Sequence, residues 1–343
     1  MKILYAIQGT GNGHMARAYE VIPQLQKYGD VDLLVSGTQC DIRLPWPIKY
    51  RYHGLSFIFG KNGGVDLRKT ILGFRPFRML KEIFSVPVHK YDLVLNDFEP
   101  IVAWASTFRQ VKCIGISHQS AVLHPNAPAP ASKDKLGYNI LKYYAPCKQS
   151  YGFHFQALDK TISTPVIRKD IRSGKITNKG HYTVYLPSYD DQKIVDVLSQ
   201  IPYIQWQVFS KHNSKAFQSG NVQIQPVNKD KFTESFISSM GILCNAGFET
   251  PAEALFMGKK LCVIPMKGQY EQQCNAAFLE NMGICTLKHL SSSVERLNEW
   301  VYFDQPQKIA YADNLSDTIE DIIENVCRTH ESYPDFAINQ ILR

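Results

Sequence analysis

Short apolar runs alternate with amphipathic segments along the first half of the chain. The apolar runs are rich in Ile, Leu and Val, which is typical of buried strands. We predict strands at Ile3–Ile7, Val31–Val35, Lys49–Tyr52, Leu93–Leu95 and Cys113–Ile116, and helices at about 15–28, 68–84 and 99–109. This alternation favours an α/β fold, in which helices cover a parallel sheet.

The alternation resumes after residue 180. Strands are predicted at Tyr182–Leu186, Gln205–Phe209, Val222–Gln225, Gly241–Cys244 and Leu261–Ile264, and helices near 190–200, 230–238, 250–257 and 270–281. Residues 164–180 carry charges, a proline and glycines without a sustained apolar period, which indicates an interdomain linker. We therefore predict Rossmann-like domains at 1–163 and 181–315. A C-terminal helix and tail at 316–343 are expected to pack back on the first domain.

The composition favours a soluble protein of two domains. The chain has 343 residues, of which 44% are hydrophobic, so each domain can bury its own core. No apolar run reaches the length of a membrane-spanning helix, and Met1-Lys2 leads directly into a predicted strand. We therefore expect a cytoplasmic protein. Its eight cysteines are scattered without a CxxC pair, which favours reduced thiols.

The most informative segment is residues 245–276. An apolar strand leads into a small-residue turn at Ala246-Gly247, and a helix is predicted from about Thr250. The free amides and the dipole at the start of such a helix suit a diphosphate. Glu253 lies about one turn into the helix, where a carboxylate can accept hydrogen bonds from the hydroxyls of a ribose. The segment therefore indicates a nucleotide-sugar site.

This segment resembles the donor-binding signature of GT-B glycosyltransferases, especially the MurG-like group and the related UDP-glycosyltransferases. The matching positions are Gly247, Thr250, Glu253, Gly258, Pro265, Glu271, Gln272, Asn275 and Ala276. Lys259-Lys260 departs from the pattern, because the family usually has a proline after the preceding glycine. The resemblance implies that Glu253 binds the ribose and that Glu271 and Gln272 contact hydroxyls of the donor sugar.

Two further loops are candidates for the donor site. The loop after Leu186 could supply Ser188 or main-chain amides to the phosphates, and the resemblance places the backbone of Val227 at the nucleobase. The expected donor-binding residues are therefore Gly11, Gly13, Ser188, Val227, Gly247, Phe248, Glu249, Thr250, Glu253, Glu271, Gln272 and Asn275. No cofactor or metal is expected, because a helix terminus already offsets phosphate charge and similar GT-B enzymes generally work without a bound metal.

The N-terminus carries a second, weaker signal. Residues 8–13 form the run Gln-Gly-Thr-Gly-Asn-Gly after a predicted strand, and His14 opens a helix. Alone, the three glycines fit a structural tight turn equally well. Beside the donor motif, the run resembles the Gly-rich loop of MurG-like enzymes, whose histidine lies where the two domains face each other. His14 is therefore the leading catalytic candidate.

Polar residues also follow other strands of the first half, at the sheet edge where ligands bind. Asp97 and Glu99 follow one predicted strand, and His118 and Gln119 follow the next. Asp97 could orient His14 or bind acceptor hydroxyls, but an N-cap for the next helix explains one of the two carboxylates equally well. His118 fits a structural histidine as well as an acceptor contact. We take Asp97 as catalytic and Glu99, His118 and Gln119 as acceptor-binding candidates.

These candidates predict transfer of a sugar, UDP-linked in the simplest case, to an unidentified acceptor such as a lipid-linked molecule or a glycan. The reaction would be a direct displacement, expected to invert the anomeric centre, with His14 as general base or phosphate contact and Asp97 as its orienter. A nucleotide-sugar hydrolase or epimerase could use the same scaffold, and an acceptor-free assay for released sugar would identify hydrolysis. A non-catalytic sugar-nucleotide-binding protein is a further alternative, although binding alone would not need residues on opposite rims.

Residues 66–90 combine basic and apolar side chains. The basic ones are Arg68, Lys69, Arg75, Arg78, Lys81 and Lys90. With a formal charge of +7 and a sequence pI near 8.8, this pattern suggests a peripheral contact with an anionic membrane at its inner face. A packed helix with a solvated basic face explains it too. The loop at 60–64 could gate the acceptor side. Nucleic-acid binding is not indicated, because no recognisable module carries the basic residues.

Overall fold

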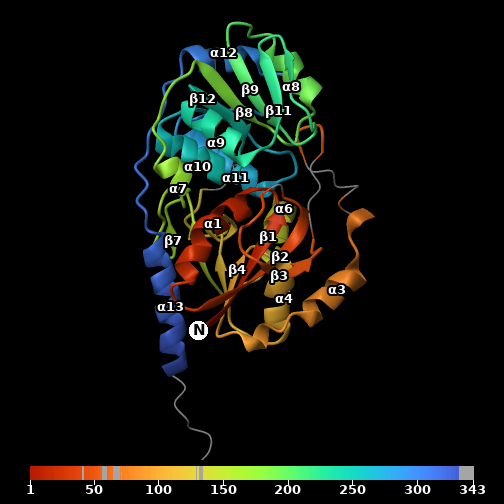
Figure 1. The fold of residues 1–343 in the computed structure, drawn as a ribbon, viewed down its shortest axis with the longest axis vertical. Helices are drawn as coiled ribbons and strands as arrows, with labels where there is room; N and C mark the ends of the chain where they lie inside the picture. Colours follow the sequence, from red (N-terminus) through yellow and green to blue (C-terminus); the bar gives the residue numbers. More distant parts are fainter. Residues whose placement is uncertain are drawn as a thin grey trace, which may run out of the picture.

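The computed structural model describes residues 1–40, 42–55, 60–64, 70, 72–128, 130 and 134–331. They form two α/β domains that follow each other along the long axis of the molecule (Figure 1). Each domain contains a seven-stranded sheet with helices on its faces. The α/β prediction is therefore confirmed.

The N-terminal sheet has the order β3-β2-β1-β4-β5-β6-β7, and its described pairings are all parallel. Its strands are β1 (Lys2–Thr10), β2 (Asp30–Gln39), β3 (Ile48–Tyr52), β4 (Leu93–Asp97), β5 (Cys113–Ile116), β6 (Gln149–Phe153) and β7 (Ile162–Ser163). Its helices are α1 (Gly13–Leu25), α3 (Pro76–Ser85), the 3-10 turn η1 (Val88–Lys90), α4 (Pro100–Phe108), α5 (His118–Val122) and α6 (Lys135–Tyr144). Because β1 is central, Ile3–Ile7 have no exposed surface.

The C-terminal sheet has the order β10-β11-β9-β8-β12-β13-β14, and only the β10–β11 hairpin is antiparallel among the described pairings. Its strands are β8 (His181–Tyr185), β9 (Gln205–Ser210), β10 (Phe217–Ser219), β11 (Val222–Pro226), β12 (Gly241–Asn245), β13 (Lys260–Ile264) and β14 (Cys285–Thr286). Its helices are α8 (Asp191–Leu198), α9 (Lys229–Ser238), α10 (Glu249–Met257), α11 (Tyr270–Asn281) and α12 (Val294–Tyr302).

Strand order reverses once in each sheet, between β1 and β4 in the first and between β8 and β12 in the second. At such a point the loops leave the carboxyl ends of neighbouring strands toward opposite faces, and a crevice opens between them. The residues that follow these four strands therefore lie at the natural ligand sites of the two domains.

Two segments connect the domains on the side opposite α3 (Figure 1). One contains α7 (Lys169–Arg172), and the other leads from α12 to α13 (Leu315–Glu331). Helix α13 lies along the N-terminal domain, where Ile319, Ile322 and Val326 join its core with residues of α1. The predicted tail from 332 to 343 lies outside the described residues.

The helix expected at 68–84 is interrupted in the structure: Thr70, Leu72 and Gly73 are helical, but Phe74 and Arg75 are not. Helix α3 begins only at Pro76, a residue that favours the first turn of a helix because it lacks the N–H that a helix start leaves unpaired. Residues 65–69 and 71, which belong to the same prediction, lie outside the described residues. None of the helices described is both long and apolar enough to cross a membrane.

Lys259 explains the departure from the glycosyltransferase pattern after Gly258. Its side chain is buried, and its Nζ donates to the carbonyls of Thr177 at 3.0 Å, Ile237 at 2.6 Å and Ser239 at 2.6 Å. These contacts tie the linker to the end of α9. A proline could not make them, since it has no side-chain donor.

We predict that Lys259→Met lowers the free energy of unfolding by about 2–4 kcal/mol, because three carbonyls lose a donor, among them the buried carbonyl of Ser239. Urea denaturation measures the change. Lys175→Met, at an exposed linker position, is the matched control and should shift stability by less than about 0.5 kcal/mol. Equal stability of the two variants would show that the Lys259 contacts do not hold the linker.

Candidate active site

A cleft of 470 Å³ lies between the domains, at the carboxyl ends of both sheets. Most of the residues selected from sequence line it: Gly11, Gly13, His14, His118, Gln119, Val227, Gly247, Phe248, Glu249, Thr250, Glu253, Glu271 and Gln272. Asp97, Glu99, Ser188 and Asn275 lie behind this lining. The structure thus brings the two motifs, which are more than two hundred residues apart in the sequence, to one cavity.

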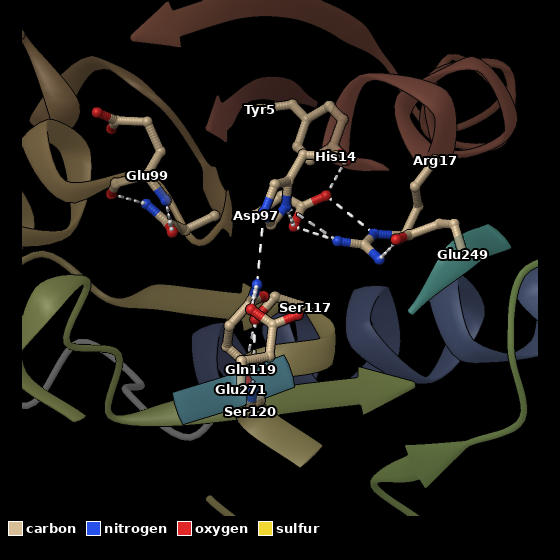
Figure 2. Close-up of polar contacts among 11 residues, drawn as sticks. Tyr5, His14, Arg17, Asp97, Glu99, Ser117, Gln119, Ser120, Glu249 and Glu271 are labelled. Carbon is tan, nitrogen blue, oxygen red and sulfur yellow. Dashed lines mark hydrogen bonds and ion pairs between the residues drawn. The ribbon is translucent and has the colours of Figure 1, made fainter. Parts of the chain in front are cut away.

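His14 and Asp97 form a hydrogen-bonded pair at the point where strand order reverses. His14 is in the first turn of α1, and Asp97 is the last residue of β4. The His14 Nδ1 lies 2.8 Å from Asp97 Oδ1, and the Asp97 side chain is fully buried. The other ring nitrogen, Nε2, points to the Gln119 side chain, 3.5 Å away (Figure 2). A histidine held in this way can accept a proton on Nε2 while Asp97 stabilises the imidazolium.

Arg17 belongs to the same cluster, although sequence reasoning did not select it. It lies one turn after His14 on α1 and donates to Asp97 through Nε at 3.0 Å and Nη2 at 2.7 Å. Its Nη1 forms an ion pair with Glu249 across the cleft, and the Tyr5 hydroxyl donates to Asp97 at 3.3 Å. The helical spacing of three residues from His14 was the available signal, because it places both side chains on one face.

Ionisation in this cluster is set by burial and by neighbouring charges. Burial raises the pKa of Asp97, but Arg17 and His14 lower it more, so the carboxyl is ionised at neutral pH. Burial alone would lower the pKa of Arg17, yet Asp97 and Glu249 hold it well above its usual range. Burial and the charge of Asp97 raise the pKa of Tyr5, so its hydroxyl remains a neutral donor.

The start of α10 faces this cluster from the C-terminal domain. Glu249 is the first residue of α10, and the N-cap residue Phe248 makes no side-chain cap. Gly13 packs against Glu249 so closely that a Cβ on Gly13 would lie 2.6 Å from Glu249 Oε2. A side chain at position 13 would therefore displace the Glu249 carboxylate, and the Gly-rich loop meets the positive end of the α10 dipole here.

Glu253 lies in the cleft, but its carboxylate is paired with an arginine of the linker. Arg168 donates to Glu253 through Nε at 2.6 Å and Nη2 at 2.7 Å. Sequence reasoning missed Arg168, which also lines the cleft. The pair places a cation of the linker directly beside the predicted ribose partner.

The other donor candidates hold the loops around the cleft. The Gln272 side chain accepts from the Met266 amide at 3.0 Å, and Ser188 donates to Asn245 at 3.2 Å. Glu271 accepts from Gln119 at 2.9 Å, and burial raises the pKa of Glu271. The lining thus joins loops of both domains through side-chain contacts.

Two acceptor candidates are engaged inside the protein. Glu99 is fully buried and accepts from the amides of Ile101 at 2.8 Å and Val102 at 2.6 Å, so it is an N-cap of α4. The two ring nitrogens of His118 each lie 2.7 Å from an oxygen, one on Phe153 and one on Asn275. Burial lowers the pKa of His118 to about 4, which favours a neutral ring. These contacts correspond to the alternatives considered from the sequence, an N-cap for Glu99 and a structural histidine for His118.

A second cavity of 360 Å³ adjoins the cleft within the N-terminal domain. Gln119 lines both cavities, and its buried Oε1 has no hydrogen-bond partner among the described residues. The lining includes the aromatic, hydroxyl, amide and basic side chains of Asn96, Phe98, Ser117, Ser120, Tyr138, Lys142, Tyr143 and Ser150, together with the aliphatic side chains of Leu123 and Leu141. This cavity therefore has a mixed polar and aromatic surface, and the Gln119 side chain lies between it and His14. Within the described ranges, no group of three or more His, Cys, Asp and Glu side chains could hold a metal ion.

Two Rossmann-like domains that face each other across a nucleotide-sized cleft define the GT-B class. The structure is similar to MurG from Acinetobacter baumannii (16% identity, TM-score 0.53, covering 94% of this chain and 99% of that one). It is also similar to the glycosyltransferase SnogD from Streptomyces nogalater (14%, 0.51, 95% and 95%) and to UGT89C1 from Arabidopsis thaliana (13%, 0.56, 95% and 94%). The model of glycosyl transferase family 1 matches residues 1–303, so the chain belongs to that family and is a glycosyltransferase. These findings confirm the predicted fold and resemblance. No curated protein sequence matches the chain significantly.

The burial of the Glu99 carboxyl predicts a pH effect on stability. Burial raises the pKa of Glu99 from 4.5 to about 7, so between these values the folded protein binds this proton more tightly than the unfolded chain does. Its contribution to the free energy of unfolding therefore falls as pH rises from 4.5 to 7, by at most about 1.4 kcal/mol per pH unit. Glu99→Gln removes this term. Urea denaturation at several pH values should show wild type losing stability relative to Glu99→Gln over this range, and a constant difference would contradict the assignment.

Proposed function

We propose that the protein transfers a sugar from a nucleoside-diphosphate sugar, UDP-linked in the simplest case, to an acceptor hydroxyl by direct displacement. One observation carries this proposal: the His14–Asp97 pair and the start of α10 face each other across one cleft. A base on one rim and an anion-binding helix terminus on the other are the two groups that such a displacement needs.

The donor fits the C-terminal side of the cleft. Its diphosphate would lie at the first turn of α10, beside Gly247 and Thr250, and its ribose would reach Glu253. The cleft also carries the cationic side chains of Arg43 and Lys229, which favour an anionic ligand. Two related structures support this choice of donor, since UGT89C1 was solved with UDP and VinC with dTDP.

The reaction follows from the geometry. His14 Nδ1 donates to Asp97, so Nε2 takes the proton of the acceptor hydroxyl as its oxygen attacks the anomeric carbon. The bond from that carbon to the diphosphate oxygen breaks, and the amides at the start of α10 stabilise the negative charge on the leaving group. Attack from the face opposite the diphosphate inverts the anomeric centre. The helix terminus supplies the charge compensation, so the proposed mechanism is metal-independent.

The acceptor fits the second cavity, which meets the cleft at Gln119. The buried Oε1 of Gln119 can accept a hydrogen bond from an acceptor hydroxyl, and the aromatic lining suits the face of a sugar ring. Helix α6, which borders the cavity, exposes Leu136, Ile140 and Tyr143. A glycan acceptor that carries a lipid would place its polar part in the cavity and its apolar part along α6.

Helix α3 supports contact with the inner face of the membrane. It stands at the edge of the N-terminal domain and exposes Phe77 by 87% and Phe84 by 60%, whereas only Glu82 and Ile83 are buried (Figure 1). The same short helix carries the basic residues Arg78 and Lys81. Exposed aromatic rings beside cations are typical of helices that lie on anionic lipid. Helix α3 packs on α4 through Ile83, yet both rings stay largely exposed, which supports docking of a cytoplasmic enzyme at the membrane through α3.

We expect one nucleotide family, among UDP, GDP, dTDP and their common sugar conjugates, to stabilise the protein against thermal unfolding. At a ligand concentration of one hundred times Kd the gain is about 2.7 kcal/mol. Glu253→Gln should lose most of the ligand-induced shift, because it removes the charged ribose partner. Glu234→Gln, at an exposed position of the same domain, is the control and should keep it. No shift with any nucleotide would overturn the donor assignment.

Vesicle co-sedimentation tests the membrane proposal. Binding to vesicles that contain phosphatidylglycerol should exceed binding to pure phosphatidylcholine, and salt should weaken it. Phe77→Ser with Phe84→Ser should reduce binding several-fold. Phe303→Ser, at a ring exposed by 76% in the other domain, is the matched control and should bind like wild type. Equal binding of both variants would exclude α3 as the docking surface.

A further inference from the structure

Four contacts converge on the buried carboxylate of Asp97. Oδ1 lies 2.7 Å from Arg17 Nη2 and 2.8 Å from His14 Nδ1. Oδ2 accepts from Arg17 Nε at 3.0 Å and from the Tyr5 hydroxyl at 3.3 Å (Figure 2). Arg17 is itself 2% exposed, so this bidentate ion pair is shielded from water. Arg17 therefore supplies the positive charge beside a carboxylate that has no access to solvent.

The protonation state of Asp97 determines which nitrogen of His14 carries the proton. An ionised Asp97 can only accept, so it selects the tautomer with the proton on Nδ1 and leaves the Nε2 lone pair for an acceptor hydroxyl. A protonated Asp97 could donate to Nδ1 and would then favour the tautomer with the proton on Nε2. That tautomer has no lone pair at the position where the base must act. Burial without a compensating cation pushes a carboxyl toward this protonated state.

We propose that Arg17 is a positioning residue for His14: it keeps Asp97 in the form that holds the His14 proton on Nδ1. The role of His14 as base rests on the proposed function, whereas its tautomer does not. Arg17 Nη2 also lies 3.1 Å from His14 Nδ1, but it donates to Asp97 Oδ1 at the shorter distance of 2.7 Å, so the proposed effect runs through Asp97.

The orientation of Arg17 is fixed from the opposite domain. Its Nη1 pairs with Glu249, the first residue of α10, while Nε and Nη2 face Asp97. Glu271 also faces the cluster, but Gln119 lies between it and His14. The planar guanidinium thus links the dyad to the helix that is proposed to hold the donor. A lysine at position 17 could supply the charge but not this fork of donors.

The tautomer can be measured without any substrate. In protein labelled with ¹⁵N-histidine, the His14 signals are assigned among the ten histidines by their loss in His14→Gln. Wild type should show a protonated Nδ1 and an unprotonated Nε2 at a pH where the ring is neutral. Arg17→Met should show either a mixture of the two tautomers or the tautomer with the proton on Nε2. If the methionine variant folds poorly, Arg17→Gln should show the same change. Arg17→Lys should retain the wild-type pattern, since it keeps the charge.

Two comparisons separate positioning from a purely structural role. Glu249→Gln removes the interdomain ion pair but leaves Arg17 on Asp97, so it should keep the wild-type tautomer. In the Asp97→Asn background, Arg17→Met should not move the His14 proton further from Nδ1 to Nε2, because that effect runs through the carboxylate, although loss of the direct Arg17–His14 contact changes the chemical shifts themselves. An unchanged Nδ1–H pattern in folded Arg17→Met protein would overturn the proposal, whatever its loss of stability.

Once a donor and acceptor are known, Arg17→Met should lower kcat by about 10²-fold or more, which is the contribution expected of a positioned base. Arg17→Lys should recover part of that loss. Full turnover by His14→Gln would refute the base under the proposed function, while the tautomer measurement would still decide the role of Arg17.

Discussion

The site depends on one topological constraint: each sheet reverses its strand order once, and the two reversals face the same cleft. Loops that leave neighbouring strands at a reversal diverge, so their first residues border an open crevice. His14 and Asp97 follow β1 and β4, whereas the turn at Gly247 follows β12. The His14–Asp97 pair and the start of α10 can therefore face each other, although they are far apart in the sequence.

The burial of charged groups determines how Asp97 and Arg17 are held at the cleft. Asp97 has no exposed surface, and an ion pair at such a depth contributes little to stability, because desolvation offsets most of the attraction. What the pair with Arg17 does provide is a fixed direction for both side chains. Lys259 has its direction fixed in a comparable way, by three carbonyls in place of a carboxylate, and ties the linker to the C-terminal domain.

The sequence predicted the fold well wherever a segment carried its own pattern. The apolar period of β1 and the helix at 270–281 needed no tertiary information, and α11 spans Tyr270–Asn281. The edge strands β7 and β14, of two residues each, escaped prediction because pairing with a neighbour defines them. Most of the candidate site residues that the sequence predicted cluster in the two motifs, at 8–14 and 245–276. Arg17 and Arg168 were missed because their carboxylate partners lie 80 and 85 residues away, and a single arginine carries no pattern of its own.

Arg17 and Arg168 hold α10 at the cleft through ion pairs. Glu249 and Glu253 lie one turn apart on α10, and each pairs with an arginine from outside the C-terminal domain, Arg17 on α1 and Arg168 beside α7. Without these cations, two carboxylates near the helix start would repel a diphosphate and cancel part of the helix dipole. With them, each carboxylate of α10 has a cation at ion-pair distance, Arg17 being shared with Asp97, and this weakens the repulsion of an anion at the amide terminus. The ion pairs therefore make the proposed ribose contact of Glu253 compatible with the proposed phosphate site on the same helix, and they connect that helix to the domain that carries His14.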